Sequence, residues 1–407
     1  MAAADPYAPL RIPNFRKLLV SYGTLTIARE AQIVVIGWQL YARTGDPLVL
    51  GLIGLAEALP YIGVALYAGH VADRTERRAV AVVGTLGILV SAITLLLFTL
   101  EPRLLSNGIW PVYVVIALSA VARSFTRPAV TALSAEVIPR ELYPQGVAWR
   151  TSTWQFAAIL GPAFGGMMYG FAGAAWAYGA VVLLMAASVV AIASVTHRVR
   201  PTATEEVPLG QSLTTGIRFL WNEPVILAAM TLDLFAVLFG GAVALLPAFA
   251  KLLDAGPQGL GILRAAPAAG AILTGLWIAH RPPMKRAGVA LLLSVAAFGV
   301  CMIGFALSRS FWLSFALLLA SGMVDNVSVV IRSTLVQTRT PEQMLGRVSS
   351  VNQMFIGASN EIGAFESGVA ARLLGVVPSV VFGGAMTLLI VGLVAAKAPQ
   401  LRKLKTL

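Results

Sequence analysis

Long, nearly uncharged apolar blocks recur along this chain, and they limit its possible folds more than any other feature. Clear examples are Ala79–Phe98 and Ala287–Leu307. A run of about 18 or more mainly apolar residues can cross the hydrocarbon of a bilayer as a helix. A soluble protein usually carries roughly twice the 12% of charged residues found here. The sequence therefore predicts an all-α membrane protein with many spans.

Twelve spans fit the pattern, and an even number places both termini on the same side of the membrane. No cleavable signal peptide is expected, because the first apolar segment is longer than a signal sequence. The predicted spans cover residues 15–42, 48–68, 79–99, 110–134, 146–169, 173–195, 224–250, 257–279, 286–307, 311–335, 346–370 and 376–397.

The net charge of +12 is explained by where the basic residues fall. Twenty of the 30 Lys and Arg residues lie in one alternate set of loops and tails, and five lie in the other set. Because basic loops remain in the cytoplasm, both termini are expected there. No basic block is interleaved with aromatic residues, so the sequence does not indicate nucleic-acid binding.

The longest polar stretch, Thr196–Gln211, divides the chain near its middle. The predicted domains are a six-helix half at residues 1–195, a cytoplasmic linker at 196–223 and a second six-helix half at 224–407. Apolar residues from 209 to 220 recur at helical spacing. They indicate either an amphipathic helix on the membrane surface or a simple entry into the seventh span.

A short loop after the second span carries the most specific motif, "GHVADRTERR", from Gly69 to Arg78. Gly69 would let two helices approach closely, and Asp73 would accept hydrogen bonds from arginines or helix amides. The expected conformational latch consists of Gly69, Asp73, Arg74, Arg77, Arg78 and, as a partner for Asp73 from the fourth span, Arg123.

With this loop, the chain resembles the major facilitator superfamily, and several stretches look like its branch of siderophore (enterobactin) and drug exporters. A second match is "GPAFGG" in the fifth span, similar to the packing motif of exporters and antiporters. The residues of this motif are Gly161, Pro162, Gly165 and Gly166. Small residues at this spacing let helix backbones pack closely. The resemblance implies two pseudo-symmetric six-helix halves around a central cavity.

Ionisable and amide side chains fall inside the predicted spans, where charge is costly and usually functional. On the first span, Tyr22, Arg29, Gln32 and Gln39 share a stripe expected to face the cavity. Arg127 and Arg332 are expected to be structural instead. The candidates for substrate binding or proton coupling are Arg29, Glu30, Gln32, Glu57, Asp233, Arg264, Asp325, Asn352, Asn360 and Glu361.

The stretch "SNEIGAFESG" places two acids in the eleventh predicted span. Glu361 falls past the middle of the span and is a plausible wall of the outer cavity. Glu366 falls near the outer interface, where it is either hydrated or paired with Arg264 of the eighth span. The residues alone leave open whether this stretch serves substrate, proton or packing.

The function these features predict is secondary active transport, most consistent with proton-coupled export of small amphipathic organic compounds. An importer or a lipid carrier on the same fold is the alternative. No motif of a hydrolase, metalloprotease or nucleotide-binding enzyme is present. The expected partners are the small-molecule substrate, protons and the lipid bilayer, without a cofactor or a metal, and the chain is expected to act as a monomer.

Overall fold

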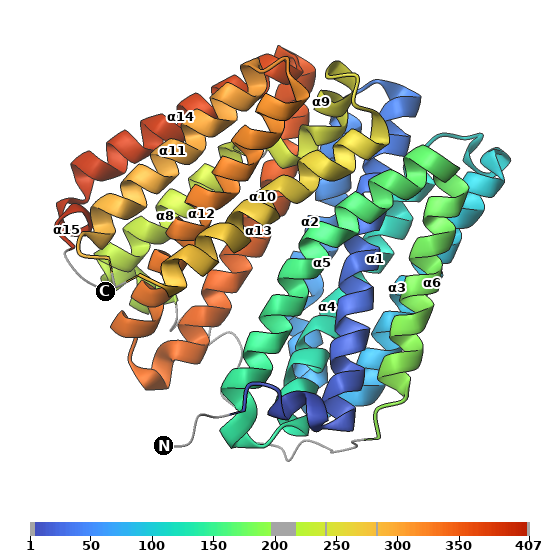
Figure 1. Cartoon of the computed structure of the whole chain (residues 1–407), viewed down its shortest axis with the longest axis horizontal. Helices are drawn as coiled ribbons and strands as arrows, with labels where there is room; N and C mark the ends of the chain where they lie inside the picture. The colour runs from blue at the N-terminus through green and yellow to red at the C-terminus, as the bar shows by residue number, and fades with distance from the viewer. Residues whose placement is uncertain (1–4, 197–216, 241, 282–283, 405–407) are drawn as a thin grey trace. The chain divides into compact units, whose positions relative to one another are not determined.

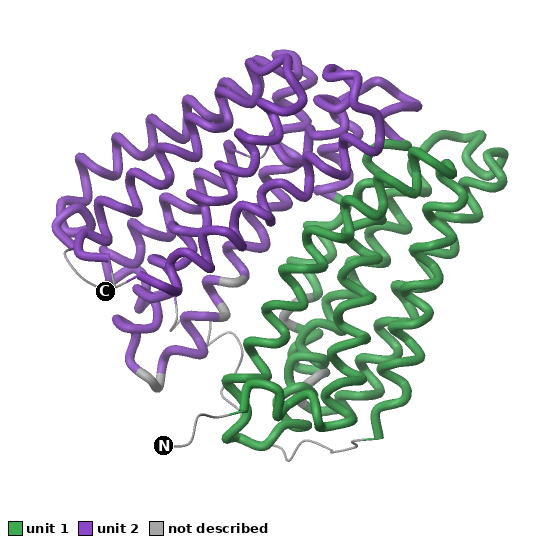
Figure 2. Tube along the Cα trace, in the orientation of Figure 1, with its two compact units in different colours: residues 1–39, 56–205 green, residues 40–55, 206–407 purple. Residues whose placement is uncertain are grey.

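The computed structural model of the chain describes residues 5–196, 217–240, 242–281 and 284–404. Side chains at a few helical positions, that of Asp73 among them, fall outside the description. Most of the predicted linker also falls outside it. The described residues fold into helices and connecting turns (Figure 1). They form two compact units, one of residues 1–39 with 56–205 and the other of residues 40–55 with 206–407 (Figure 2).

The helices of the first unit follow the predicted spans closely. Within it, α3 packs against both α4 and α6, and α5 packs against α6. The α1–α2 corner, residues 40–55, groups with the second unit instead. The helices are α1 (Pro13–Thr44), α2 (Leu48–Arg74), α3 (Arg77–Leu100), α4 (Trp110–Val137), α5 (Tyr143–Ala172) and α6 (Ala174–Ala193).

In the second unit, α10 packs on α12, and α11 packs on both α12 and α14. Helix α8 lies against α13 and α14. Apolar side chains of α8 and α11, such as Leu232 and Leu291, are fully buried in one cluster. The elements are α8 (Pro224–Phe239), α9 (Leu246–Leu252), α10 (Gly256–Ala279), α11 (Ala287–Leu307), α12 (Phe311–Arg339), α13 (Glu342–Leu374), α14 (Val376–Lys397) and α15 (Pro399–Arg402).

The seventh predicted span is broken, which corrects the expectation of one continuous helix over residues 224–250. Helix α8 ends at Phe239, and the chain continues as a short 3-10 turn and then as α9. Pro247 lies in the first turn of α9, where its missing N–H costs nothing. In an uninterrupted helix, the same proline would remove a backbone hydrogen bond and clash with the preceding turn.

The two units repeat one junction. Helices α5 and α6 meet at Gly173, with φ of 86°, and α13 and α14 meet at Gly375, with φ of 94°. Glycine adopts this left-handed backbone without the steric penalty of a side chain, so the chain reverses within one residue. The two junctions lie about 200 residues apart, close to half the length of the chain.

Eight of the helical segments in the described part of the chain are long and apolar enough to cross a membrane. They include the broken segment Pro224–Leu252. The other long helices, α2, α4, α5 and α13, have 27 to 33 residues. At about 1.5 Å per residue, each of these is also long enough to span the hydrocarbon. The chain is a multi-pass helical membrane protein.

The "GPAFGG" motif brings the backbone of α5 against that of α1. A Cβ atom added at Gly165 would lie 2.6 Å from the carbonyl oxygen of Ala31, and one at Gly161 would lie 2.8 Å from that of Ile27. These distances leave no room for any side chain. Close approach of this kind is how helices pack in lipid, because van der Waals contact is their main attraction there.

Gly165→Ala is expected to destabilise the first unit by about 1–3 kcal/mol, because the new methyl group meets backbone that cannot move aside. Gly179→Ala in α6 is the matched control, since a Cβ there would meet nothing within 4 Å. Both changes gain about the same helix propensity. Thermal aggregation of the purified protein in detergent, followed by size-exclusion chromatography, should separate the two variants. Equal midpoints would contradict the packing role of Gly165.

Candidate functional site

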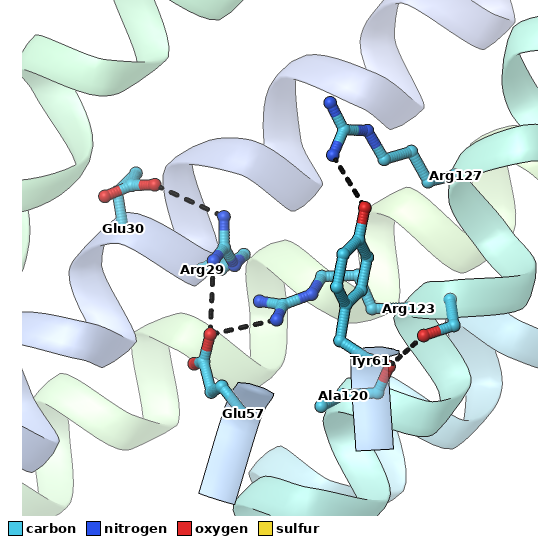
Figure 3. A network of polar contacts seen from close by, with 8 residues as sticks. Arg29, Glu30, Glu57, Tyr61, Ala120, Arg123 and Arg127 are labelled. Carbon is cyan, nitrogen blue, oxygen red and sulfur yellow. Dashed lines mark hydrogen bonds and ion pairs between the residues drawn. The ribbon is translucent and has the colours of Figure 1, made fainter. Parts of the chain in front are cut away.

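A cluster of charged side chains lies inside the first unit, contributed by three helices (Figure 3). Helix α1 supplies Arg29 and Glu30, α2 supplies Glu57, and α4 supplies Arg123. Arg29 and Glu30 are adjacent on α1 and therefore point about 100° apart around that helix. The sequence analysis named these four residues as candidates, but it did not predict which of them form ion pairs with one another.

Glu57 is the centre of this cluster. Its Oε2 atom accepts a hydrogen bond from Arg123 Nη2 at 2.9 Å and another from Arg29 Nη2 at 3.4 Å. Arg29 Nη1 also lies 3.6 Å from Glu30 Oε1. The side chains of Glu57 and Glu30 are only 14% and 18% exposed. Two arginines and two glutamates therefore neutralise one another in a setting where an isolated charge would be expensive.

Two further arginines extend the polar face without a carboxylate partner among the described residues. Arg127, one helical turn beyond Arg123, donates from Nη1 to the Tyr61 hydroxyl at 3.5 Å (Figure 3). Arg150 of α5 donates from Nη2 to Thr131 Oγ1 at 3.2 Å, and its guanidinium lies 5.6 Å from the ring centroid of Tyr22. Both arginines therefore have hydroxyl groups as hydrogen-bond acceptors.

The predicted stripe on α1 holds only in part. Gln39 donates to Thr99 of α3 at 3.1 Å and accepts from the Tyr178 hydroxyl of α6 at 3.0 Å. It therefore lies against α3 and α6, while Arg29 turns to Glu57 of α2. Gln32 is buried, with 8% exposure. Arg29 and Gln39 diverge because they are ten residues apart, which at 3.6 residues per turn places them about 80° apart around the helix.

The second unit holds a separate group of charges around α8 and α12. Arg332 forms an ion pair with Asp233, and the two side chains are 11% and 10% exposed. Arg332 Nε also donates to the carbonyl of Ser328 at 3.3 Å. The sequence analysis did not predict this pair, because Asp233 and Arg332 lie on different helices. Spacing within α12 shows only that Asp325, Ser328 and Arg332 share one face of that helix.

Asp325 lies at the middle of α12 and faces a small cavity beside this ion pair. The cavity is wide enough for a water molecule. Its lining is contributed by α8, α11 and α12 and consists of Asp233, Ala236, Val237, Ser294, Val295, Phe298, Asp325 and Ser328. Within the described part of the chain, no cation pairs with Asp325. The site therefore combines Asp233, whose charge is neutralised by Arg332, with Asp325, which lines the cavity.

Two arginines of the loop motif contact the ends of neighbouring helices. Arg77 pairs with Glu136 at the end of α4, and Arg78 donates to the carbonyl of Ala193 at the end of α6 at 2.5 Å. Arg123, the expected partner of Asp73, donates to Glu57. The side chain of Asp73 lies outside the described residues, and Arg74 is exposed.

Gly69 does not serve the close helix approach that its sequence position suggested. A Cβ atom added there would meet no described atom within 4 Å. The tight contacts of α2 occur at its other end, where Gly51 and Gly54 lie against α13. A glycine in a loop motif can therefore be mistaken for a packing residue when only its neighbours in sequence are known.

The stretch "SNEIGAFESG" of α13 packs between the start of α2 and the end of α8. A Cβ atom at Gly368 would lie 2.6 Å from the Cα of Gly51, and one at Gly363 would lie 2.9 Å from the carbonyl of Val237. The small residues of this stretch therefore serve packing. At the adjoining α1–α2 corner, Arg372 pairs with Asp46 at 3.4 Å.

The polar candidates of α13 lie among these contacts. Asn360 donates to the carbonyl of Ile356 in its own helix at 2.8 Å, and Asn352 is half-buried two turns earlier. Glu361 is partly buried, and Glu366 is bonded to Ser367. Arg264, on α10, is also partly buried. Among the residues that the structure describes, no group of three or more His, Cys, Asp or Glu side chains could hold a metal ion.

Known proteins with similar sequences or folds are transporters. The Major Facilitator Superfamily model matches residues 18–364 of this chain. The enterobactin exporter EntS of Escherichia coli O1:K1 / APEC is 28% identical over 347 residues, which cover 82% of this chain and 77% of that protein. EntS of Shigella flexneri is 27% identical over 341 residues, with the same coverage of both chains.

Solved structures with a similar fold come from several transporters. A peptide transporter POT is 13% identical, covers 100% of both chains and gives a TM-score of 0.74. The nucleoside transporter NupG is 11% identical, covers 95% of this chain and 100% of its own, and gives a TM-score of 0.73. At these identities the likeness concerns the fold alone.

Proposed function

Because the chain belongs to the major facilitator superfamily and is a transporter rather than an enzyme, we propose that it exports small amphipathic organic compounds in exchange for protons. The observation that carries the proton part of this proposal is the cavity of the second unit. There, Asp325 lies beside the Asp233–Arg332 ion pair, in the middle of a membrane-spanning helix.

Asp325 suits the task of carrying the proton better than the glutamates of the first unit do. Glu57 pairs with both Arg29 and Arg123, and Glu30 pairs with Arg29, so both glutamates already have cationic partners. Asp325 faces a cavity with room for water and has no such partner among the described residues. A lone carboxylate within a span is a functional group by default.

The groups around Asp325 define what its protonation would change. Helix α8 presents Asp233, and α12 itself presents Arg332. Helix α11 lines the cavity with Ser294, and α10, which packs on the other side of α12, carries Arg264 as its one charged residue. Protonation of Asp325 leaves the Asp233–Arg332 pair neutral, whereas its ionisation adds one negative charge that attracts Arg332. The two states therefore differ in how strongly α8 and α12 are held together.

The direction of transport rests on the sequence of the relatives and on the distribution of basic residues. The relatives that cover most of the chain are enterobactin exporters. Basic residues concentrate in one set of loops, which supports cytoplasmic termini. Since nucleoside and peptide transporters share the fold, import is the alternative that an experiment must exclude.

Accumulation of fluorescent amphiphiles in a host without its own efflux pumps tests this proposal. The probes are three pyrene derivatives with the same ring system: 1-pyrenesulfonate, 1-pyrenemethanol and 1-pyrenemethylammonium. Expression of the chain should lower the cellular level of at least one probe, and a protonophore should restore it. Higher accumulation on expression would show import, and an unchanged level of all three would contradict export of this class of compound.

A further inference from the structure

We infer that the first unit binds the anionic head of the substrate, through Arg127 and Arg150 with the rings of Tyr22 and Tyr61. This inference rests on the proposed transport function and specifies the substrate class as organic anions with an aromatic or other apolar body. Four helices converge on the site: α1 and α2 supply the tyrosines, and α4 and α5 supply the arginines.

The balance of charge in the first unit indicates that the ligand carries a negative charge. Arg29 and Arg123 are matched by Glu30 and Glu57. Arg127 and Arg150 have only neutral partners among the described residues, a tyrosine hydroxyl and a threonine hydroxyl. The polar face therefore carries two positive charges in excess. Such a face attracts an anion and repels a cation of the same size.

Both arginines lie within the length of their helices, where Arg127 is exposed and Arg150 is partly buried. Arg127 lies ten residues before the cytoplasmic end of α4, or about 15 Å, and Arg150 lies seven residues into α5, or about 10 Å. Arg150 Nε is buried and has no hydrogen-bond partner. A buried donor without a partner is rare in folded proteins. An anion at this position would accept from that donor and neutralise the guanidinium.

The aromatic rings fit the apolar part of the same ligand. The Arg150 guanidinium lies over Tyr22, and Arg127 and Arg29 also lie within electrostatic reach of the Tyr22 hydroxyl. Tyr61 points its hydroxyl at Arg127 (Figure 3). Both rings are half-buried, so each presents an apolar face beside a cation. This combination recognises an amphiphile whose charge is negative and whose body is flat and apolar.

The phosphate of an anionic lipid carries the same chemistry, and the experiment must separate it from a free substrate. Binding of 1-pyrenesulfonate to the purified full-length protein is measured by energy transfer from tryptophan, with and without added phosphatidylglycerol. 1-Pyrenemethylammonium serves as the probe of opposite charge. The variants are Arg127→Gln, Arg150→Gln and Arg150→Lys, with Arg140→Gln in the exposed loop before α5 as the matched control.

We expect 1-pyrenesulfonate to bind at least tenfold more tightly than the cation. Each glutamine variant should lose about tenfold in that affinity. Arg150→Lys should keep part of the affinity, because the charge remains while the planar fork is lost, and Arg140→Gln should bind as the unchanged protein does. Equal binding of both probes, or unchanged binding in both glutamine variants, would overturn the inference. So would complete competition by phosphatidylglycerol, which would assign the site to a lipid headgroup.

This binding assay needs no transport, so it separates the two proposals. If the protein binds 1-pyrenesulfonate through Arg127 and Arg150 but no probe is exported from cells, the anion site stands and the proposed export is wrong. If cells export 1-pyrenemethylammonium while the arginine variants behave normally, export stands and the anion site is wrong.

Discussion

Asp325→Asn is expected to abolish proton-driven export while leaving substrate binding within about twofold of the unchanged protein. Asparagine has nearly the shape of aspartate, so the cavity between α8, α11 and α12 keeps its lining. It cannot load or release a proton, however, so the cycle loses its coupling step. We expect the export rate under an imposed pH gradient to decrease by about 100-fold. A loss of this order is typical when an enzyme loses a general acid or base.

The matched control for this variant is Asp254→Asn. Asp254 lies in the turn between α9 and α10, where its φ is 54°, a conformation that asparagine tolerates. It should export normally and respond normally to the gradient. Downhill exchange of substrate without a gradient distinguishes a lost coupling group from a damaged fold. Asp325→Asn should retain such exchange, and its complete loss there would indicate structural damage.

Glu57→Gln is expected to destabilise the first unit by about 3 kcal/mol. The change leaves Arg123 and Arg29 without the carboxylate that both contact. Removing one partner of a buried ion pair costs about 3–5 kcal/mol. The lower value applies here, because the side chain of Arg29 is 38% exposed and water compensates part of its charge. The thermal aggregation midpoint in detergent should fall accordingly.

A second change should recover most of that loss. Glu57→Gln combined with Arg123→Gln replaces the shorter of the two ion pairs with neutral amides of similar length. If the pair is what stabilises the unit, the double variant should be more stable than Glu57→Gln alone, and the double-mutant cycle gives the coupling energy. Additive losses would show that Glu57 and Arg123 act independently, which would contradict the observed contact.

The sequence predicted the positions of the helices well because hydrophobic runs and glycine or proline boundaries are local features. The described helix at 376–397 matches its predicted span, and most other ends differ by a few residues. The break after Phe239 was missed because the apolar run continues through it. Hydropathy cannot distinguish one long helix from two short ones when both are equally apolar.

The candidate site was predicted less well than the fold because contacts between distant helices have no local signal. Glu57 and Asp233 were recognised as unusual in their spans, but their pairing with Arg123 and Arg332 was not predicted. Arg150 was not among the predicted candidates, although it lies within α5 over the Tyr22 ring. Helical spacing shows which residues share a face, but only the fold shows which faces meet.

The most direct test of the proposed exchange of substrate for protons is a measurement of proton movement in proteoliposomes. Vesicles that contain the purified protein and a trapped pH indicator, with the membrane potential clamped at zero, receive the pyrene probe that the cells export. Downhill movement of the probe should drive protons the opposite way in the unchanged protein and in Asp254→Asn, but not in Asp325→Asn. Probe movement without any change of internal pH, unaffected by an imposed pH gradient, would contradict proton-coupled transport.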